Sequence, residues 1–208
     1  MKVRYTGGRS LPPSFFDPLT GRDREIIDRQ MKARRFDSSL ALGAARRCSF
    51  GVPSVLLCGP LRKGRPFPTT FWLTCPHLVR LCGRKEAKGG VGLLDRLLEE
   101  KAAQWRGWNL LHARFRLSLL SPTERAFLSS RRPALWNSLR RGGAGGIDLR
   151  RGGGAKCLHL QAASWLALGF HPGEEILKEL LVPLECSSPP INGCVLSAGE
   201  DESTEKRS

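Results

Sequence analysis

The spacing of apolar residues along the chain changes near Pro76. Before that point the apolar runs are short and rich in small, branched and aromatic residues, at positions 39–45, 52–58 and 69–73, which is typical of strands. After it, apolar residues recur every three or four positions, which is typical of helices that bury one face. The pattern predicts an α+β fold, with a small, mostly antiparallel sheet within residues 39–73 packed on a predominantly helical second half.

The longest predicted helix covers residues 93–119, where apolar side chains form one stripe: Leu94, Leu98, Trp105, Trp108, Phe115 and Leu119. His112 lies on that stripe, and its simplest interpretation is a buried histidine bonded to a backbone carbonyl. Proline and glycine at the ends of other apolar segments favour further helices. These are predicted at residues 23–35, 76–87, 122–129, 133–141, 155–168 and 173–181.

A chain of 208 residues is long enough for one sizeable core. We expect a loosely docked arm at residues 1–22, a single globular domain at residues 23–186 and a disordered tail at residues 187–208, which is rich in serine, proline, glycine and acidic residues. The first residues carry no apolar signal segment, and no apolar run approaches the roughly 18 to 20 residues that span a bilayer. These features predict a cytoplasmic protein that is not inserted in a membrane.

The formal charge is +15, and the last nine residues carry four acids against Lys206 and Arg207, which leaves +17 on the rest. Such a charge attracts RNA, DNA or polyphosphate. The candidate contacts lie on two loops rich in glycine and proline: Arg62, Lys63 and Arg65 on the first, and Arg150, Arg151 and Lys156 on the second. The alternative is a basic surface that is simply solvated, because no motif that reads nucleic acid is present.

Seven cysteines without a secretory signal indicate reduced thiols rather than a disulfide framework. Cys48, Cys75 and Cys157 fall at three predicted element junctions, and His159 follows closely. One hypothesis is that these four residues bind zinc or an iron–sulfur cluster. Buried structural cysteines are the alternative, since no pair has the spacing C-x-x-C. In a regular helix, moreover, residues 157 and 159 would point about 200° apart.

A second hypothesis is a thiol enzyme, in which Cys157 or Cys75 is the nucleophile and His159 or His77 is the base. The glycine-rich stretch 142–154 would then hold an anionic substrate, with Arg150, Arg151 and Lys156 as its cations. It lacks the spacing of a P-loop, and a flexible linker is the alternative. Near the chain end, Cys186 and Cys194 could meet each other, close over the site or remain two separate thiols.

Three motifs, in order, resemble the bacterial domain-of-unknown-function family 501 over roughly residues 23–173. They are Arg-Arg-Cys-Ser-Phe-Gly-Val-Pro (46–53), Pro-Phe-Pro-Thr-Thr-Phe-Trp-Leu-Thr-Cys-Pro (66–76), and Gly-Gly-Ile (145–147) leading to Lys-Cys-Leu-His (156–159). The resemblance implies a cytoplasmic bacterial protein of uncharacterised activity and adds phosphate or polyphosphate chemistry as one alternative. Members commonly carry a second histidine where this chain has Gln161, which counts against a site that needs histidine there.

Overall fold

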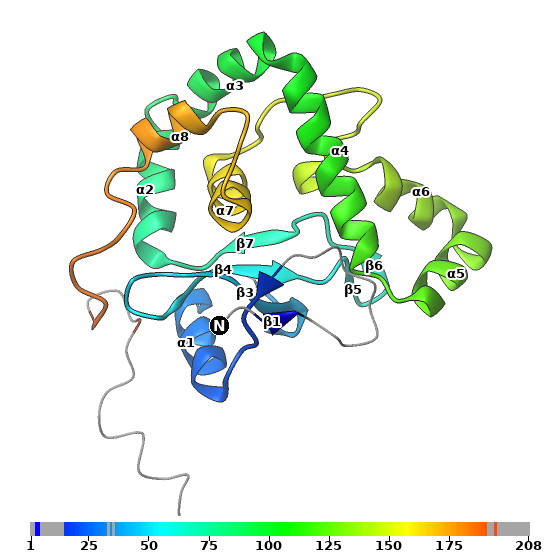
Figure 1. Cartoon of the computed structure of the whole chain (residues 1–208), viewed down its shortest axis with the longest axis horizontal. Coiled ribbons are helices and arrows are strands. Elements are labelled where there is room, and N and C mark those ends of the chain that lie inside the picture. Colours follow the sequence, from blue (N-terminus) through cyan, green and yellow to red (C-terminus); the bar gives the residue numbers. More distant parts are fainter. Residues whose placement is uncertain (1–2, 5–14, 33, 35, 191–193, 195–208) are drawn as a thin grey trace, which may run out of the picture.

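The chain is described by a computed structural model that covers residues 3–4, 15–32, 34, 36–190 and 194. Its main sheet has three antiparallel strands in the order β3-β4-β7 (Figure 1), namely β3 (Ala41–Arg47), β4 (Pro53–Cys58) and β7 (Phe71–Leu73). Helices make up most of the chain after β7, so the predicted α+β class is confirmed. Every residue of the central strand β4 is buried, because other elements cover both faces of the sheet.

The alternation of side chains along β4 divides the core between those two faces. Val55 and Leu57 belong to the large cluster that also contains residues of the later helices. Leu56 and Cys58 point to the other face, where they pack with residues of α1 (Gly21–Met31) and with Leu40 of the short turn η1 (Ser38–Leu40). The single strand β4 therefore holds two hydrophobic clusters together.

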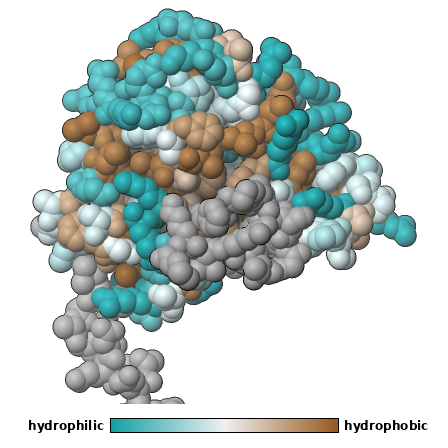
Figure 2. Space-filling view, viewed as in Figure 1, coloured by the Kyte–Doolittle hydropathy of each residue, from teal (hydrophilic) through white to brown (hydrophobic). Residues whose placement is uncertain are grey.

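The second half contains a buried helix, α7 (Leu158–Leu168), which packs on β7 and on α2, and further helices. They are α2 (Pro76–Glu86), α3 (Gly90–Glu100), α4 (Ala102–Ser118), α5 (Pro122–Arg131), α6 (Pro133–Arg141) and α8 (Glu174–Leu180), with a short turn η2 (Ala144–Gly146) before α7. In the same view, Figure 2 shows an apolar band across the middle of the molecule and hydrophilic residues over α3. The large core cluster is thus built around α7, whereas Leu128 of α5 and Leu139 of α6 pack in a cluster of their own.

The loop between β4 and β7 contains a two-stranded hairpin, β5 (Leu61–Arg62) and β6 (Arg65–Pro66). Its two turn residues, Lys63 and Gly64, both have positive φ, at 49° and 73°, as short hairpin turns commonly require. The hairpin lies beside α6 and carries exposed basic side chains, as the sequence suggests. A further short pair joins β1 (Val3–Arg4) to β2 (Phe15–Phe16).

The long helix predicted at residues 93–119 is divided into α3 and α4 at Lys101, whose backbone has φ −100° and ψ 35°. Neither proline nor glycine marks this break in the sequence. The cause is tertiary, since the Lys101 ammonium donates to Pro172 O (3.1 Å) and pairs with Glu175 of α8. Turning the chain there lets α3 pack against α8 as well as α4.

A buried arginine in α4 fixes the glycine-rich turn that follows α6. The Arg116 guanidinium donates to Gly142 O (2.6 Å), Gly143 O (2.5 Å) and Pro68 O (2.8 Å). Burial lowers its pKa to about 10. Carbonyl oxygens accept from Nη1 and Nη2, whereas Nε has no hydrogen-bond partner among the described residues. Arg116 thus ties α4 to two distant loops, and its burial keeps it from an outside anion.

Residues near both ends of the described chain are buried against the rest of the fold. Phe16 is buried, and Asp17 forms an isolated bridge with Ala44 of β3. Cys194 lies within the predicted tail, yet it is buried among Ile26 and Val52. Packed chain therefore continues beyond residue 186, while residues 191–193 and 195–208 of the predicted tail lie outside the described residues.

Two histidines are buried, and burial lowers the pKa of each to about 3. His112 lies edge-on to Trp108, and its Nε2 has no hydrogen-bond partner among the described residues, so the expected backbone carbonyl is not bonded to that atom. His171 accepts from the Gly173 N–H at Nδ1 (2.9 Å) and donates from Nε2 to Gln161 Oε1 (3.0 Å). The Gln161 amide in turn donates to Ala155 O (2.7 Å). Gln161 is thus a structural residue.

We expect the free energy of unfolding to fall as the pH is lowered from about 6.5 toward 3. The unfolded chain binds a proton on each ring below its ordinary pKa of 6.5, whereas the folded chain keeps both rings neutral to about pH 3. At about pH 5 this difference costs about 2 kcal/mol per histidine. Urea unfolding at about pH 7 and about pH 5 measures it, and His171→Asn should remove about 2 kcal/mol of the pH-dependent loss. If the free energy of unfolding of His171→Asn fell between these two pH values by as much as that of the wild type, the neutral, buried His171 would not be its cause.

Candidate metal centre

The start of α7 is capped by two side chains from different parts of the chain. Cys157 is the N-cap, and its Sγ accepts from the Leu160 N–H (3.4 Å). Glu86, the last residue of α2, reaches across, and its Oε1 accepts from the Leu158 N–H (2.6 Å) and the His159 N–H (3.4 Å). The first N–H groups of a helix have no partner within the helix, so a buried helix start needs such acceptors.

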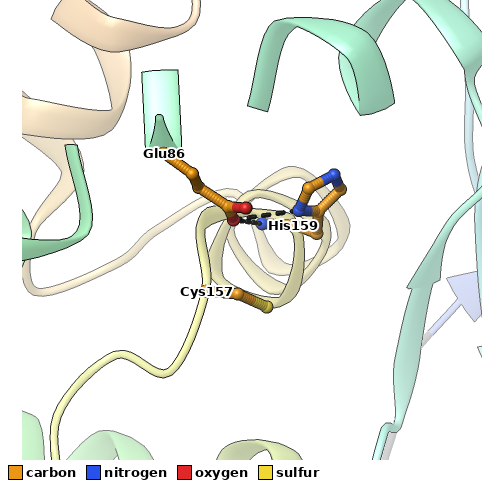
Figure 3. Close-up of side chains that lie close together, drawn as sticks. All are labelled: Glu86, Cys157 and His159. Atoms are coloured by element: carbon orange, nitrogen blue, oxygen red, sulfur yellow. Dashed lines mark hydrogen bonds and ion pairs between the residues drawn. The ribbon is translucent and has the colours of Figure 1, made fainter. Parts of the chain in front are cut away.

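His159 completes the cluster. Its Nδ1 lies 2.9 Å from Glu86 Oε1, and its Nε2 lies 3.1 Å from Val79 O. Figure 3 shows Glu86 directed at the imidazole, with the Cys157 side chain beside the same helix start. One ligand atom from each of Glu86, Cys157 and His159 lies within 4.8 Å of the other two, and all three residues are partly buried.

The irregular position of Cys157 is what allows this meeting. Its backbone is extended, with φ −158° and ψ 155°, so it precedes the first helical turn. The separation of about 200° that a regular helix imposes on residues 157 and 159 therefore does not apply. Cys157 and His159 were predicted from the sequence as ligands of one ion, and their ligand atoms do lie within 4.8 Å of each other.

The geometry does not favour a thiol nucleophile at this position. Burial raises the pKa of the Cys157 thiol, and Glu86 adds to the rise, although the N–H groups of Leu160 and His159 and the Arg34 guanidinium oppose it. The depressed pKa expected from a helix start is thus outweighed by desolvation. Both ring nitrogens of His159 face other groups, Glu86 and Val79 O, so no bond between thiol and base is formed.

Cys75 offers no better nucleophile. Burial raises its pKa to about 11, despite the N–H groups of Leu78 and His77 that face the sulfur. The imidazole of His77 donates from Nε2 to Pro183 O (2.8 Å). The pairing of Cys75 with His77 as nucleophile and base is therefore also unsupported.

Cys48 and Cys75 lie away from Cys157. Cys75 is the N-cap of α2 and Glu86 is its last residue, so the two are separated by the whole helix of 11 residues, a length of about 16 Å. Cys48 lies in the turn between β3 and β4, where its N–H donates to Val52 O (2.9 Å). Within the described chain, no group of three or more potential ligands other than Glu86, Cys157 and His159 is so closely gathered. The structure therefore does not bring the four predicted ligands to one ion.

Glu86 was missed by reasoning from the sequence, although one signal was available. It ends α2, and a carboxylate at the carboxyl end of a helix is opposed by the helix dipole. An acid in that position is better explained by a partner outside its own helix. Here the partners are the N–H groups of the α7 start and the ring of His159, more than 70 residues away.

The glycine-rich loop before α7 is occupied by the protein's own groups. Asp95 of α3 accepts from the Ala155 N–H (2.6 Å), where a bound phosphate would be expected. Lys156 has φ 66° and donates to Gly145 O (2.8 Å), and Arg150 pairs with Asp148 (3.6 Å). Arg150 and Arg151 are exposed and line an open groove of about 420 Å³ together with Arg106. The loop is thus a basic surface rather than an enclosed phosphate cradle.

Residues 44–179, more than half of the chain, match the family described as "Protein of unknown function (DUF501)". The chain belongs to this family. The match includes Glu86, Cys157 and His159 as well as Cys48 and Cys75 of this DUF501 chain. Comparisons with curated proteins and with solved structures found no match. In the part of the DUF501 chain that is described, no helix has the length and apolar character needed to cross a membrane.

Replacing Glu86 tests its capping role. Glu86→Ala removes the acceptor of the Leu158 N–H and the partner of His159, and should lower the free energy of unfolding by about 1–3 kcal/mol. Glu86→Gln keeps a carbonyl acceptor and should cost less. Glu99→Ala, an exposed acid of α3, is the matched control. A change below about 0.5 kcal/mol for Glu86→Ala in urea unfolding would contradict the capping role.

Proposed function

We propose that this protein binds one transition-metal ion, preferably zinc, through Glu86, Cys157 and His159. The observation that carries the proposal is the gathering of their three ligand atoms within 4.8 Å. Zinc accepts carboxylate, thiolate and imidazole ligands at about 2.0–2.3 Å, so tetrahedral ligand atoms lie about 3.3–3.8 Å apart. Small side-chain rotations would bring the three groups to those distances. An iron–sulfur cluster is less favoured here, because such clusters are held mainly by thiolates.

The surroundings of His159 support a cation at this position. Glu86 Oε1 and Val79 O both accept hydrogen bonds, whereas a neutral imidazole has only one N–H to donate. If the N–H on Nε2 donates to Val79 O, the lone pair of Nδ1 points at the Glu86 carboxylate. That arrangement is repulsive unless a proton or a metal ion lies between them. A backbone carbonyl on the second ring nitrogen is also the usual support of a histidine ligand.

Three protein ligands leave one coordination position for water or a small anion. The side chains of His159 and Glu86 are 24% and 25% exposed, so such a molecule has access to the ion. An ion held in this way supplies Lewis acidity and lowers the pKa of a bound water. The protein would then contribute orientation of the ligands through the start of α7.

Zinc titration of chelator-treated protein tests the proposal. Calorimetry should detect a binding event that Cys157→Ser and His159→Asn each weaken by at least tenfold, because each removes one of three ligands. Cys58→Ala is the control, since Cys58 is a buried thiol of the opposite face of the sheet. If both ligand variants bound the same number of zinc ions as the wild type, with unchanged affinities, the cluster would be only a helix cap.

A second function, binding of a polyanion, is favoured by the distribution of charge. Residues 101–173 contain 12 lysines and arginines but only two acids, Glu124 and Asp148. Exposed Arg140 and Arg141 end α6, which lies beside the hairpin that carries Arg62, Lys63 and Arg65. Arg150, Arg151 and Lys156 are exposed on the loop that follows. RNA, DNA and polyphosphate all present the repeated phosphates that such a surface would attract.

Binding of a short DNA duplex between about 50 and about 200 mM salt tests this second function. The double variant Arg140→Ala with Arg141→Ala should lower the slope of log affinity against log salt by about 2, because each phosphate contact contributes about 0.9. Arg22→Ala with Arg24→Ala, two exposed residues of α1, removes the same charge elsewhere. Fluorescence polarisation measures the affinity. If both double variants lowered the slope equally, the charge of the whole protein, rather than this surface, would account for the binding.

A further inference from the structure

A second group of thiols surrounds a very small cavity at the opposite end of α2. The cavity has a volume of about 10 Å³ and is lined by Cys48, Cys75, Cys186 and Cys194. These residues come from the turn between β3 and β4, the start of α2, and two positions after α8. Four of the seven cysteines thus converge from three separate parts of the chain.

The chain after α8 is held against this place by specific contacts. In Figure 1 this orange segment runs down along α2. His77 of α2 donates to Pro183 O (2.8 Å). Glu185 pairs with Arg46 of β3 (2.9 Å) and accepts from the Ser49 N–H (3.3 Å). These contacts fix the backbone on the N-terminal side of Cys186 next to both Cys48 and Cys75.

Cys194 is positioned by contacts of its own. It is 6% exposed and packs with Ile26, Val52 and Cys48. Its N–H donates to Pro189 O (3.1 Å), and the Gln30 amide of α1 donates to its Sγ (3.3 Å). An N–H donor directed at a cysteine sulfur stabilises the thiolate form that a metal requires.

We propose that Cys48, Cys75, Cys186 and Cys194 bind one zinc ion in a closed site of four thiolates. Tetrahedral zinc takes four cysteines in structural sites, and a cavity of this size accommodates one ion rather than a cluster of several irons. No three of these four sulfurs lie within 4.8 Å of one another. Side-chain rotation must therefore draw them to the about 3.8 Å separation that Zn–S bonds near 2.3 Å impose.

The charges around the cavity suit a site of this kind. Four thiolates and one Zn²⁺ carry a net charge of −2, and each thiol releases its proton to solvent as its sulfur bonds to the ion. Burial raises the pKa of both Cys75 and Cys194. The N–H groups of Leu78 and His77 oppose this rise at Cys75, and the Gln30 amide and the Arg80 guanidinium oppose it at Cys194. Glu185 also lines the cavity, and its ion pair with Arg46 neutralises its negative charge.

This site is independent of the proposed centre at Glu86, and its role differs. Its four protein ligands leave no position for water, so the ion would be structural. It would join the β3–β4 turn, the start of α2 and the chain after α8, which otherwise share few backbone hydrogen bonds. The three-ligand centre at the other end of α2 would keep its open position.

Cobalt titration of reduced, chelator-treated protein separates the two sites. Cobalt bound by four thiolates gives an intense charge-transfer absorption that scales with the number of cobalt–sulfur bonds, whereas the Glu86 centre supplies one such bond. We expect the double variant Cys75→Ser with Cys186→Ser, which removes two of the four thiolates, to lower this absorption by at least about twice as much as Cys157→Ser, which removes the one sulfur of the other centre. The reverse pattern, or an absorption indicating one sulfur in the wild type, would overturn the four-cysteine site while leaving the Glu86 centre intact.

Two further measurements guard against misfolded variants and against a disulfide. Cys58→Ala, a buried thiol outside both groups, should bind cobalt as the wild type does. Wild-type protein that is purified without reductant, treated with chelator and then unfolded should show seven thiols that react with a chromogenic disulfide. In a separate measurement, Cys157→Ser is loaded with zinc, and a chelator should then release one equivalent of zinc from it. A titre of five thiols would indicate a disulfide and would overturn the proposal.

Discussion

Burial of α7 is the constraint on which the second half of this protein depends. From Leu158 to Trp165 every residue of the helix except His159 is buried, with β7, α2 and η2 packed around it. Water cannot accept hydrogen bonds from the first N–H groups of a buried helix, so side chains must accept them instead. Glu86 and Cys157 meet that need, which means that a cap required by folding also assembles the ligands of the proposed metal centre.

Helix α2 links the two thiol-bearing regions because each of its ends belongs to one of them. Its start presents Cys75 to the β3–β4 turn and the chain after α8, and its end directs Glu86 at α7. Packing of Leu78, Leu81 and Cys82 against the core fixes the helix between these ends. A change that moved α2 along its axis would therefore disturb both regions together, although no residue is shared between them.

The sequence predicts those features that are encoded by local spacing. Val55 to Cys58 alternate between two faces, and the helices after β7 follow from apolar residues at intervals of three or four. The break at Lys101 could not be predicted, since it depends on Glu175 in a helix 74 residues away. The contact of Glu86 with His159 could not be predicted either, because the two residues are far apart in the sequence. Nor could the approach of Cys48 to Cys194, whose separation in the sequence matches no metal motif. Contacts across the fold, rather than local pattern, create both candidate sites.

Desolvation decides what kind of chemistry the cysteines of this protein can perform. Burial raises the pKa of Cys75 and Cys157, so at neutral pH their sulfurs carry protons and react slowly with carbon or sulfur electrophiles. A divalent cation changes that balance, because its charge replaces the proton directly and the surrounding N–H groups then stabilise the bound thiolate. The same burial that opposes a thiol enzyme protects a metal ligand from oxidation and exchange. Buried cysteines next to N–H donors therefore fit metal binding better than nucleophilic catalysis.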